Sequence, residues 1–192
     1  MKPKKALEEF LLKHSNLNEL ELREIINAFQ PVSLSKNEPW LKQGDTCKQI
    51  GFVSNGILKI FGEFDKEEIT LGFVFKTDFC TSLSSFINET PSRFTIQAIT
   101  DCQVLVINRE DHFDLIRKYK SWLEVDNQLL LKAYLVLEDR MLSHIQLNSQ
   151  QRYSKLFNEQ PEIFNQVPVK HLASSLGISP GTLKSFRNQE AI

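Results

Sequence analysis

The side chains with the clearest capacity to bind a ligand lie near the C-terminus, where hydroxyl, amide and basic residues follow one another closely. Such side chains donate hydrogen bonds to phosphate oxygens and to the edges of nucleic-acid bases. The chemistry they suggest is recognition of a duplex, with Lys170 and Arg187 on phosphates and the others reading bases. The full candidate set is Lys170, Ser179, Thr182, Lys184, Ser185, Arg187 and Asn188.

The surrounding sequence predicts the element that would present these residues. Residues 169–178 and 179–189 read as two short helices, and Gly177 permits a tight turn between them. Ser179 suits the N-cap and Pro180 the first helical position. The pattern predicts a helix-turn-helix, whose second helix enters the major groove; an αα-hairpin that does not bind DNA is the alternative. The residues expected to be buried are Leu172, Ala173, Leu176, Leu183 and Phe186.

Metal-ligand pairs and nucleotide-binding fingerprints are absent from the sequence. There is no H-x-H or E-x-x-H pair, no P-loop and no dinucleotide fingerprint. The cysteines, Cys47, Cys80 and Cys102, are scattered, so we interpret them as buried thiols rather than disulfides or ligands of zinc or an iron–sulfur cluster. His112 and His144 are interpreted as ordinary packed or surface residues rather than haem ligands. We expect no enzyme, no catalytic residue, no metal site and no cofactor.

The central part of the chain has the pattern of short strands. Across residues 32–107 the runs VSL, PWL, QIGFV, ILKIF, EITLGFVF, FTIQAI and CQVLVI alternate with turn residues. They predict a sandwich or barrel. Asn55-Gly56 predicts a hairpin with a type I′ turn, which needs a positive φ at both central positions. Helical patterns precede the strands over residues 4–29, with a break inside, and resume after Asn108, a residue suited to an N-cap.

The longest predicted helix, residues 122–147, is apolar on two faces. Such a helix has to be covered on both sides, and the β-rich part can cover only one. We expect a second copy of the same helix to cover the other side; burial within one large core is the alternative. The stripe predicted as the dimer interface is Leu123, Leu130, Tyr134, Leu137 and Met141, and the other stripe is Leu131, Leu135, Leu142 and Ile145.

Composition is that of a soluble globular protein, with 41% hydrophobic and 24% charged residues in a chain of 192. No apolar stretch is long enough to span a bilayer or serve as a signal core, so we expect a cytoplasmic protein without membrane association. Residues 151–192 carry five basic and three acidic side chains, a weak indication of nucleic-acid binding. We predict two domains, residues 1–148 and 149–192, the first ending in a dimerisation helix over about 121–147.

In this order the elements resemble the bacterial Crp/Fnr family of transcription regulators, over nearly the whole chain. The resemblance implies an α+β fold: an N-terminal double-stranded β-roll, jelly-roll-like and of the cyclic-nucleotide-binding type, with flanking helices, a long dimerisation helix and a C-terminal helix-turn-helix domain. The segments that carry it are KQGD at 42–45, FVSNGILKI at 52–60, CQVLVINREDHFD at 102–114, Arg152-Tyr153, and VPVKHLASSLGISPGTLKSFR at 167–187.

The sequence departs from the members of this family that bind cyclic AMP. Those members carry Gly-Glu and then Arg-Ser or Arg-Thr, which hold ribose and phosphate; here Thr81-Ser82 and Pro91-Ser92 stand at these positions. Arg93 comes one residue late, which on a strand reverses the face. We expect little or no cyclic AMP binding and leave open another small effector or none. The effector pocket implied by the resemblance comprises Thr81, Ser82, Leu83, Ser92, Arg93, Leu137 and Glu138.

The overall interpretation is a cytoplasmic bacterial regulator that binds DNA as a homodimer and responds to whatever occupies its β-roll. The second candidate is a sensor or interaction module of the same fold that no longer binds DNA. We expect the recognition helix to bind a different operator sequence from that of other Crp/Fnr regulators. Pro180, Gly181 and Ser185 stand where family members that read guanine have arginine and glutamate side chains.

Overall fold

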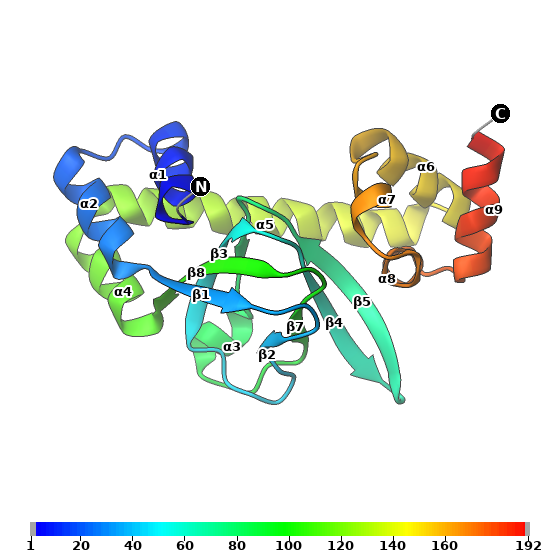
Figure 1. The fold of residues 1–192 in the computed structure, drawn as a ribbon, viewed down its shortest axis with the longest axis horizontal. Coiled ribbons are helices and arrows are strands. Elements are labelled where there is room, and N and C mark those ends of the chain that lie inside the picture. Colours follow the sequence, from blue (N-terminus) through cyan, green and yellow to red (C-terminus); the bar gives the residue numbers. More distant parts are fainter. Residues whose placement is uncertain (1–2, 191–192) are drawn as a thin grey trace. The chain divides into compact units, whose positions relative to one another are not determined.

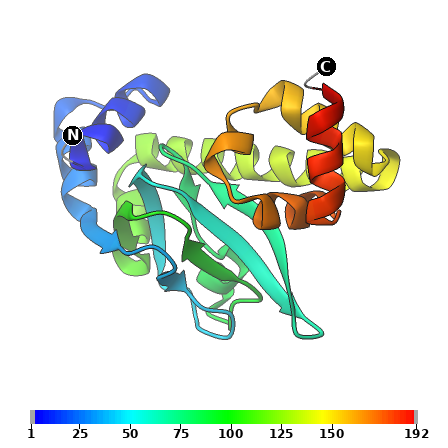
Figure 2. The same ribbon diagram turned by 45° about the vertical axis from the view of Figure 1, so that its right-hand side comes forward.

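The computed structural model describes residues 3–190, which form helices and two β-sheets (Figure 1; Figure 2). Contacts divide the chain into two compact units: the first holds residues up to 62 and 72–131, and the second holds 63–71 and those from 132 onward. The predicted domain boundary after residue 148 stays a prediction. The helices are α1 (Pro3–His14), α2 (Glu19–Ala28), α3 (Leu83–Asn88), α4 (Arg109–Lys118), α5 (Lys120–Gln146), α6 (Ser149–Glu159), α7 (Ile163–Gln166), α8 (Val169–Leu176) and α9 (Pro180–Glu190).

The strands form a sandwich of two four-stranded sheets, which confirms the predicted mixed fold with a β-sandwich. One sheet has the order β1-β8-β3-β6 and the other β2-β7-β4-β5. Residues of both sheets share one apolar core, which contains all three cysteines as buried free thiols, as predicted. Burial raises the pKa of the Cys80 thiol. The strands are β1 (Gln30–Leu34), β2 (Pro39–Leu41), β3 (Gln49–Asn55), β4 (Leu58–Phe64), β5 (Glu67–Val74), β6 (Phe79–Cys80), β7 (Thr95–Ala98) and β8 (Cys102–Asn108).

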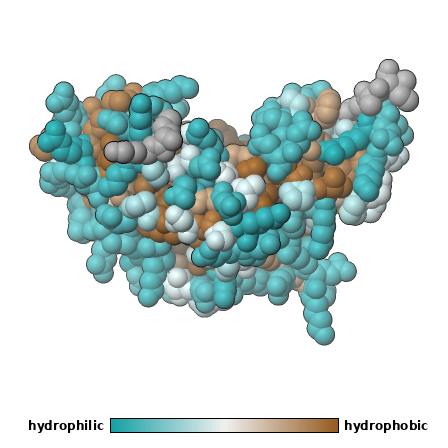
Figure 3. Space-filling model, in the orientation of Figure 1, coloured by the Kyte–Doolittle hydropathy of each residue, from teal (hydrophilic) through white to brown (hydrophobic). Residues whose placement is uncertain are grey.

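The predicted hairpin at Asn55-Gly56 is wrong, because β3 and β4 belong to different sheets. Asn55 ends β3, and only Gly56 has a positive φ, 91°. A Cβ at Gly56 would lie 2.5 Å from the Asp101 carbonyl oxygen, so this crossing between sheets needs glycine. The turn with two positive φ values is at Asp65-Lys66, between the paired strands β4 and β5. The tip of this hairpin has a hydrophilic surface, at the lower right of Figure 3.

Three short elements escaped the sequence analysis. They are β6, α3 and α7. A strand of two residues shows no alternation, and helices of six and four residues are too short to show a helical period. The helix α3 is held by tertiary contacts instead: Phe86 is buried, and Arg109 Nε donates a hydrogen bond of 2.8 Å to the Phe86 carbonyl.

Asparagine side chains cap the starts of α2 and α4, and the second of these caps was predicted. The helical pattern over residues 4–29 forms two helices, and Asn18 begins α2 by accepting hydrogen bonds of 3.0 Å from the Leu20 and Glu21 N–H groups. Asn108 begins α4 by accepting from the Asp111 N–H at 2.8 Å, as predicted. These capping hydrogen bonds join residues only two or three positions apart, so the sequence alone can predict them.

A buried histidine joins α3, α4 and α5 within the first unit. His112 is 3% exposed, and its ring contacts those of Phe86, Phe113 and Trp122, with centroids 5.3–6.0 Å apart. Its Nε2 lies 3.4 Å from Asp126 Oδ1, while Nδ1 has no hydrogen-bond partner among the described residues. Burial lowers the pKa of His112 to about 4 and raises the pKa of Asp126. His112 is therefore held as the neutral imidazole.

We expect the free energy of unfolding to fall as the pH falls through the range between the unfolded and folded pKa values of His112. Because the folded pKa is the lower one, the unfolded state binds more protons there, and the loss between about pH 7 and about pH 5 is about 2 kcal/mol. The raised pKa of Asp126 acts in the opposite direction, so the comparison is made between variants. Urea unfolding of His112→Gln, which cannot titrate, should have a flatter pH dependence than the parent and than His14→Gln, a control at an exposed position. Parallel curves for the parent and His112→Gln would contradict the assignment.

Candidate functional site

The helices α8 and α9 form a tightly joined pair, with the turn and the cap at the predicted positions. Gly177 has φ of 68°, and its N–H donates to the Ser174 carbonyl while the Ile178 N–H donates to the Ala173 carbonyl, each at 3.1 Å. Ser179 Oγ accepts from the Thr182 N–H at 3.0 Å and so caps α9. The residues predicted to be inward are buried except for Phe186, which is half-buried: Leu172, Ala173, Leu176 and Leu183.

The predicted DNA-binding residues fall into two groups: exposed side chains that are available to a ligand, and side chains that already bond to other parts of the protein. Lys184, Ser185 and Asn188 are exposed on α9, and their side chains make no hydrogen bond within residues 3–189. Lys170, also exposed, lies in the first turn of α8. Arg187 is half-buried, donates a hydrogen bond to the Phe164 carbonyl and holds its guanidinium 5.3 Å from that ring centroid. Ser179 and Thr182 hydrogen-bond to each other at 2.9 Å.

Two arginines that were absent from the predicted site hold the C-terminal end of α8. Arg152 Nε and Nη2 donate to the Leu176 carbonyl at 3.2 and 3.1 Å, and Nη1 donates to the Leu147 carbonyl at 2.7 Å. Arg140 Nη2 lies within 3.4 Å of the Ser175 carbonyl. Cations favour helix C-termini, where carbonyl oxygens lack helical partners. Arg140 therefore ties α8 to α5, and Arg152 ties α8 to α6.

Strand β5 contributes to the same cluster within the second unit. The Thr70 N–H donates to Ser174 Oγ at 2.9 Å, and the Thr70 carbonyl accepts from Arg140 Nη2 at 3.2 Å. His171 Nδ1 lies 3.5 Å from Glu68 Oε1. The sequence carried no signal for these contacts, because the partners lie far apart along the chain.

Both apolar stripes of α5 are exposed in the single chain, which corrects the expectation that the β-rich part covers one of them. The residues of α5 that are buried are Trp122 and Val125. The predicted dimer stripe has Leu123 37%, Leu130 40%, Tyr134 61%, Leu137 66% and Met141 56% exposed; the second stripe has Leu131 59%, Leu135 51%, Leu142 40% and Ile145 72% exposed.

The predicted effector residues come together only in part. Ser82 and Ser92 are buried, and Ser92 Oγ donates to Ser82 Oγ at 3.0 Å. Thr81 Oγ1 donates to the Gln49 carbonyl at 3.1 Å. Leu83 and Arg93 are exposed. The hydroxyl groups at this place therefore bond to the protein itself; Leu137 and Glu138 lie on α5, in the second unit.

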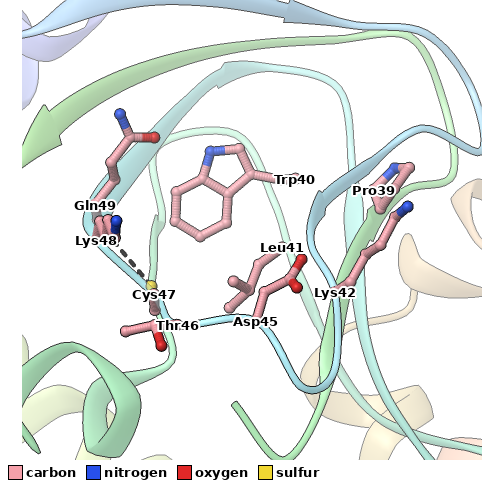
Figure 4. Close-up of a pocket in the computed structure, with 9 residues that line it drawn as sticks. All are labelled: Pro39, Trp40, Leu41, Lys42, Asp45, Thr46, Cys47, Lys48 and Gln49. Atoms are coloured by element: carbon pink, nitrogen blue, oxygen red, sulfur yellow. Dashed lines mark hydrogen bonds between the residues drawn. The ribbon is translucent and has the colours of Figure 1, made fainter. Parts of the chain in front are cut away.

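An open depression of about 380 Å³ lies elsewhere on the first unit and contains none of the predicted effector residues. The indole of Trp40 extends across it, and the Cys47 thiol donates a hydrogen bond to the Gln49 carbonyl at 3.3 Å (Figure 4). Its polar lining comes from exposed side chains of Lys42, Asp45 and Lys48. The complete lining is Pro39, Trp40, Leu41, Lys42, Asp45, Thr46, Cys47, Lys48 and Gln49.

The described part of the chain contains no group of three or more His, Cys, Asp or Glu side chains that could hold a metal ion. Within the same residues, no helix has the length and apolar character required to cross a membrane.

Comparison of the chain with known proteins supports the β-sandwich fold described above. Residues 31–119 match the model of the cyclic nucleotide-binding domain. No curated protein sequence matches the chain. Among solved structures, FixK2 from Bradyrhizobium japonicum has a TM-score of 0.73 at 13% identity, covering 84% of this chain and 83% of its own. The Thermus thermophilus catabolite activator protein has 0.57 at 20%, covering 92% and 84%.

A putative Crp/Fnr-family transcriptional regulator from Eubacterium rectale has a TM-score of 0.65 at 18% identity and covers 90% of this chain and 83% of its own. At these identities the likeness shows the fold alone. The cyclic nucleotide-binding domain spans β1 to the end of α4, and the likeness in fold extends to regulators of the Crp/Fnr family. The predicted resemblance is confirmed to that extent.

Proposed function

We propose that this protein is a Crp/Fnr-type transcription regulator that binds DNA through α8 and α9, a helix-turn-helix whose second helix enters the major groove. The observation that carries the proposal is the surface of α9, where Lys184, Ser185 and Asn188 are exposed while Leu183 is committed to the core. A recognition helix reads base edges in the major groove through hydrogen-bonding side chains on one of its faces. The fold of the neighbouring structures supports the same assignment. We further propose that the protein acts in the bacterial cytoplasm, without a catalytic role.

We propose that the functional unit is a homodimer formed through α5. The exposed face of this helix, centred on Leu130 and Leu137, supports it, because apolar patches of this kind mark interaction surfaces. A two-fold axis along paired helices would place two copies of α9 about one turn of DNA apart, ~34 Å.

We propose that any effector in the β-roll differs from cyclic AMP. The buried Ser82–Ser92 hydroxyl pair and the exposed Arg93 support this, because the roll offers no arginine at the place expected for a phosphate. An effector would act by favouring one placement of the DNA-binding helices over another.

Selection from a random duplex pool at moderate salt tests DNA binding. We expect an inverted repeat with half-sites centred ~10 base pairs apart. At that site Lys184→Ala should weaken binding by about 1–3 kcal/mol and relax the choice of one base. Lys170→Ala should weaken binding to all duplexes alike and reduce the magnitude of the slope of log K against log salt by about one for each bound subunit.

The matched control is Lys36→Ala, which removes one exposed positive charge from the first unit. It should leave the selected site unchanged, and it should change the slope of log K against log salt by less than Lys170→Ala does. If no site is enriched and the parent shows no salt-dependent binding with any effector tried, the sensor-only function replaces the one proposed.

A further inference from the structure

The exposed face of α5 carries a repeat of 3.5 residues, the spacing of a coiled coil. Leucine recurs every seventh residue, and a second residue lies four positions after each leucine. Leucines therefore occupy the d positions and the others the a positions. We call this set the α5 seam: Leu123, Asn127, Leu130, Tyr134, Leu137 and Met141.

Asn127 is the exception to the apolar character of the α5 seam. Its side chain is exposed, and its amide makes no hydrogen bond within the described residues. The neighbouring seam residues on either side, Leu123 and Leu130, are apolar. Tyr134 is also polar at its tip, yet its hydroxyl donates to Glu138 Oε1 of the same helix at 3.4 Å. Asn127 is therefore the seam residue whose polar group has no hydrogen-bond partner among the described residues.

An amide enclosed by a leucine seam is costly unless a partner across the seam accepts and donates hydrogen bonds. A second copy of this chain, parallel and in register, brings Asn127 opposite Asn127 of the partner subunit, where two amides can pair. A shift by one heptad or an antiparallel arrangement removes that pairing and leaves each amide against apolar side chains.

We propose that Asn127 sets the register and the parallel direction of the α5 pair, and so restricts its partner to a second copy of this chain. The inference rests on the proposed homodimer and adds the residue that specifies it. The dimer is less stable than it would be with leucine at this position, because an asparagine at a single position a of a coiled coil specifies the register and lowers the stability.

Disulfide trapping tests the register. In a parallel pair in register, Asn127→Cys places two thiols across the seam within bonding reach, whereas Gln128→Cys, one residue further and about 100° around the helix, does not. The native cysteines are buried and so do not compete. After mild oxidation of the full chain, we expect a covalent dimer for Asn127→Cys and little for Gln128→Cys. Equal trapping of both, or of neither, in a dimeric protein would overturn the inference.

The stability of the dimer supplies a second, independent test. Asn127→Leu should lower the dimer dissociation constant by about tenfold or more and permit other registers or larger assemblies, measured by sedimentation. Gln128→Leu, the matched control, should leave the constant within about twofold. An Asn127→Leu dimer as weak as the parent, or weaker, would place Asn127 outside the seam. A parent that is monomeric throughout would instead overturn the homodimer itself.

Discussion

Leu137→Lys is expected to convert the protein from a dimer to a folded monomer. In the single chain Leu137 is 66% exposed, so the substitution has little effect on the folding of one subunit. In the paired α5 seam it would set two ammonium groups against each other in an apolar contact. Burying unpaired charges in this way costs several kcal/mol, enough to dissociate a dimer of ordinary strength. Sedimentation at concentrations on the order of tens of micromolar reports the outcome.

The matched control for this variant is Val136→Lys, at a position of similar exposure, 60%, that lies outside the α5 seam. It should remain dimeric, and circular dichroism should show the same helix content in all three proteins. A parent that sediments as a monomer, or a Leu137→Lys variant that stays dimeric, would remove α5 as the dimer interface.

Cyclic AMP is expected to bind weakly or not at all. The site lacks both a carboxylate for the ribose and a buried arginine for the phosphate, since Ser82 and Ser92 occupy those places and bond to each other. Losing these two interactions removes about 3–6 kcal/mol, a factor of about 100 or more in affinity. Calorimetry with the full chain should therefore give no heat of binding at micromolar ligand.

A low-micromolar dissociation constant would contradict this expectation and would make Arg93 the substitute phosphate ligand. Arg93→Ala should then abolish the heat, whereas Lys48→Ala, beside the separate depression of the first unit, should abolish it only if the nucleotide binds there.

Local chemistry explains which parts of the fold were predictable. Asn108 and Ser179 cap helices, and Gly177 ends one, through contacts with residues at most five positions away. The failure at Asn55-Gly56 has the opposite origin: the residue pair suits a hairpin, but β4 joins β7 and β5 in the second sheet. Which sheet a strand joins depends on partners far away along the chain, and no dipeptide specifies it.

The candidate site was predictable to a similar degree. The exposed donors of α9 followed from helical spacing, and the departure from the cyclic AMP-binding pattern predicted the loss of the arginine. The engagement of Arg187 with Phe164, and of Arg140 with Thr70, depends on tertiary packing that leaves no periodic trace in the sequence. The second stripe of α5 could not be assigned to a partner because periodicity reports an apolar face without reporting what covers it.

The salt dependence of binding to a random duplex tests the central proposal most directly. Fluorescence anisotropy of a labelled duplex, titrated with the full chain at several salt concentrations, yields the slope of log K against log salt. If α8 and α9 bind DNA as a dimer, the slope is negative and corresponds to several phosphate contacts, and Lys170→Ala lowers its magnitude by about two, one contact for each subunit of the dimer. Binding that is absent at low salt, or that does not change with salt, would contradict the account of this protein as a DNA-binding regulator.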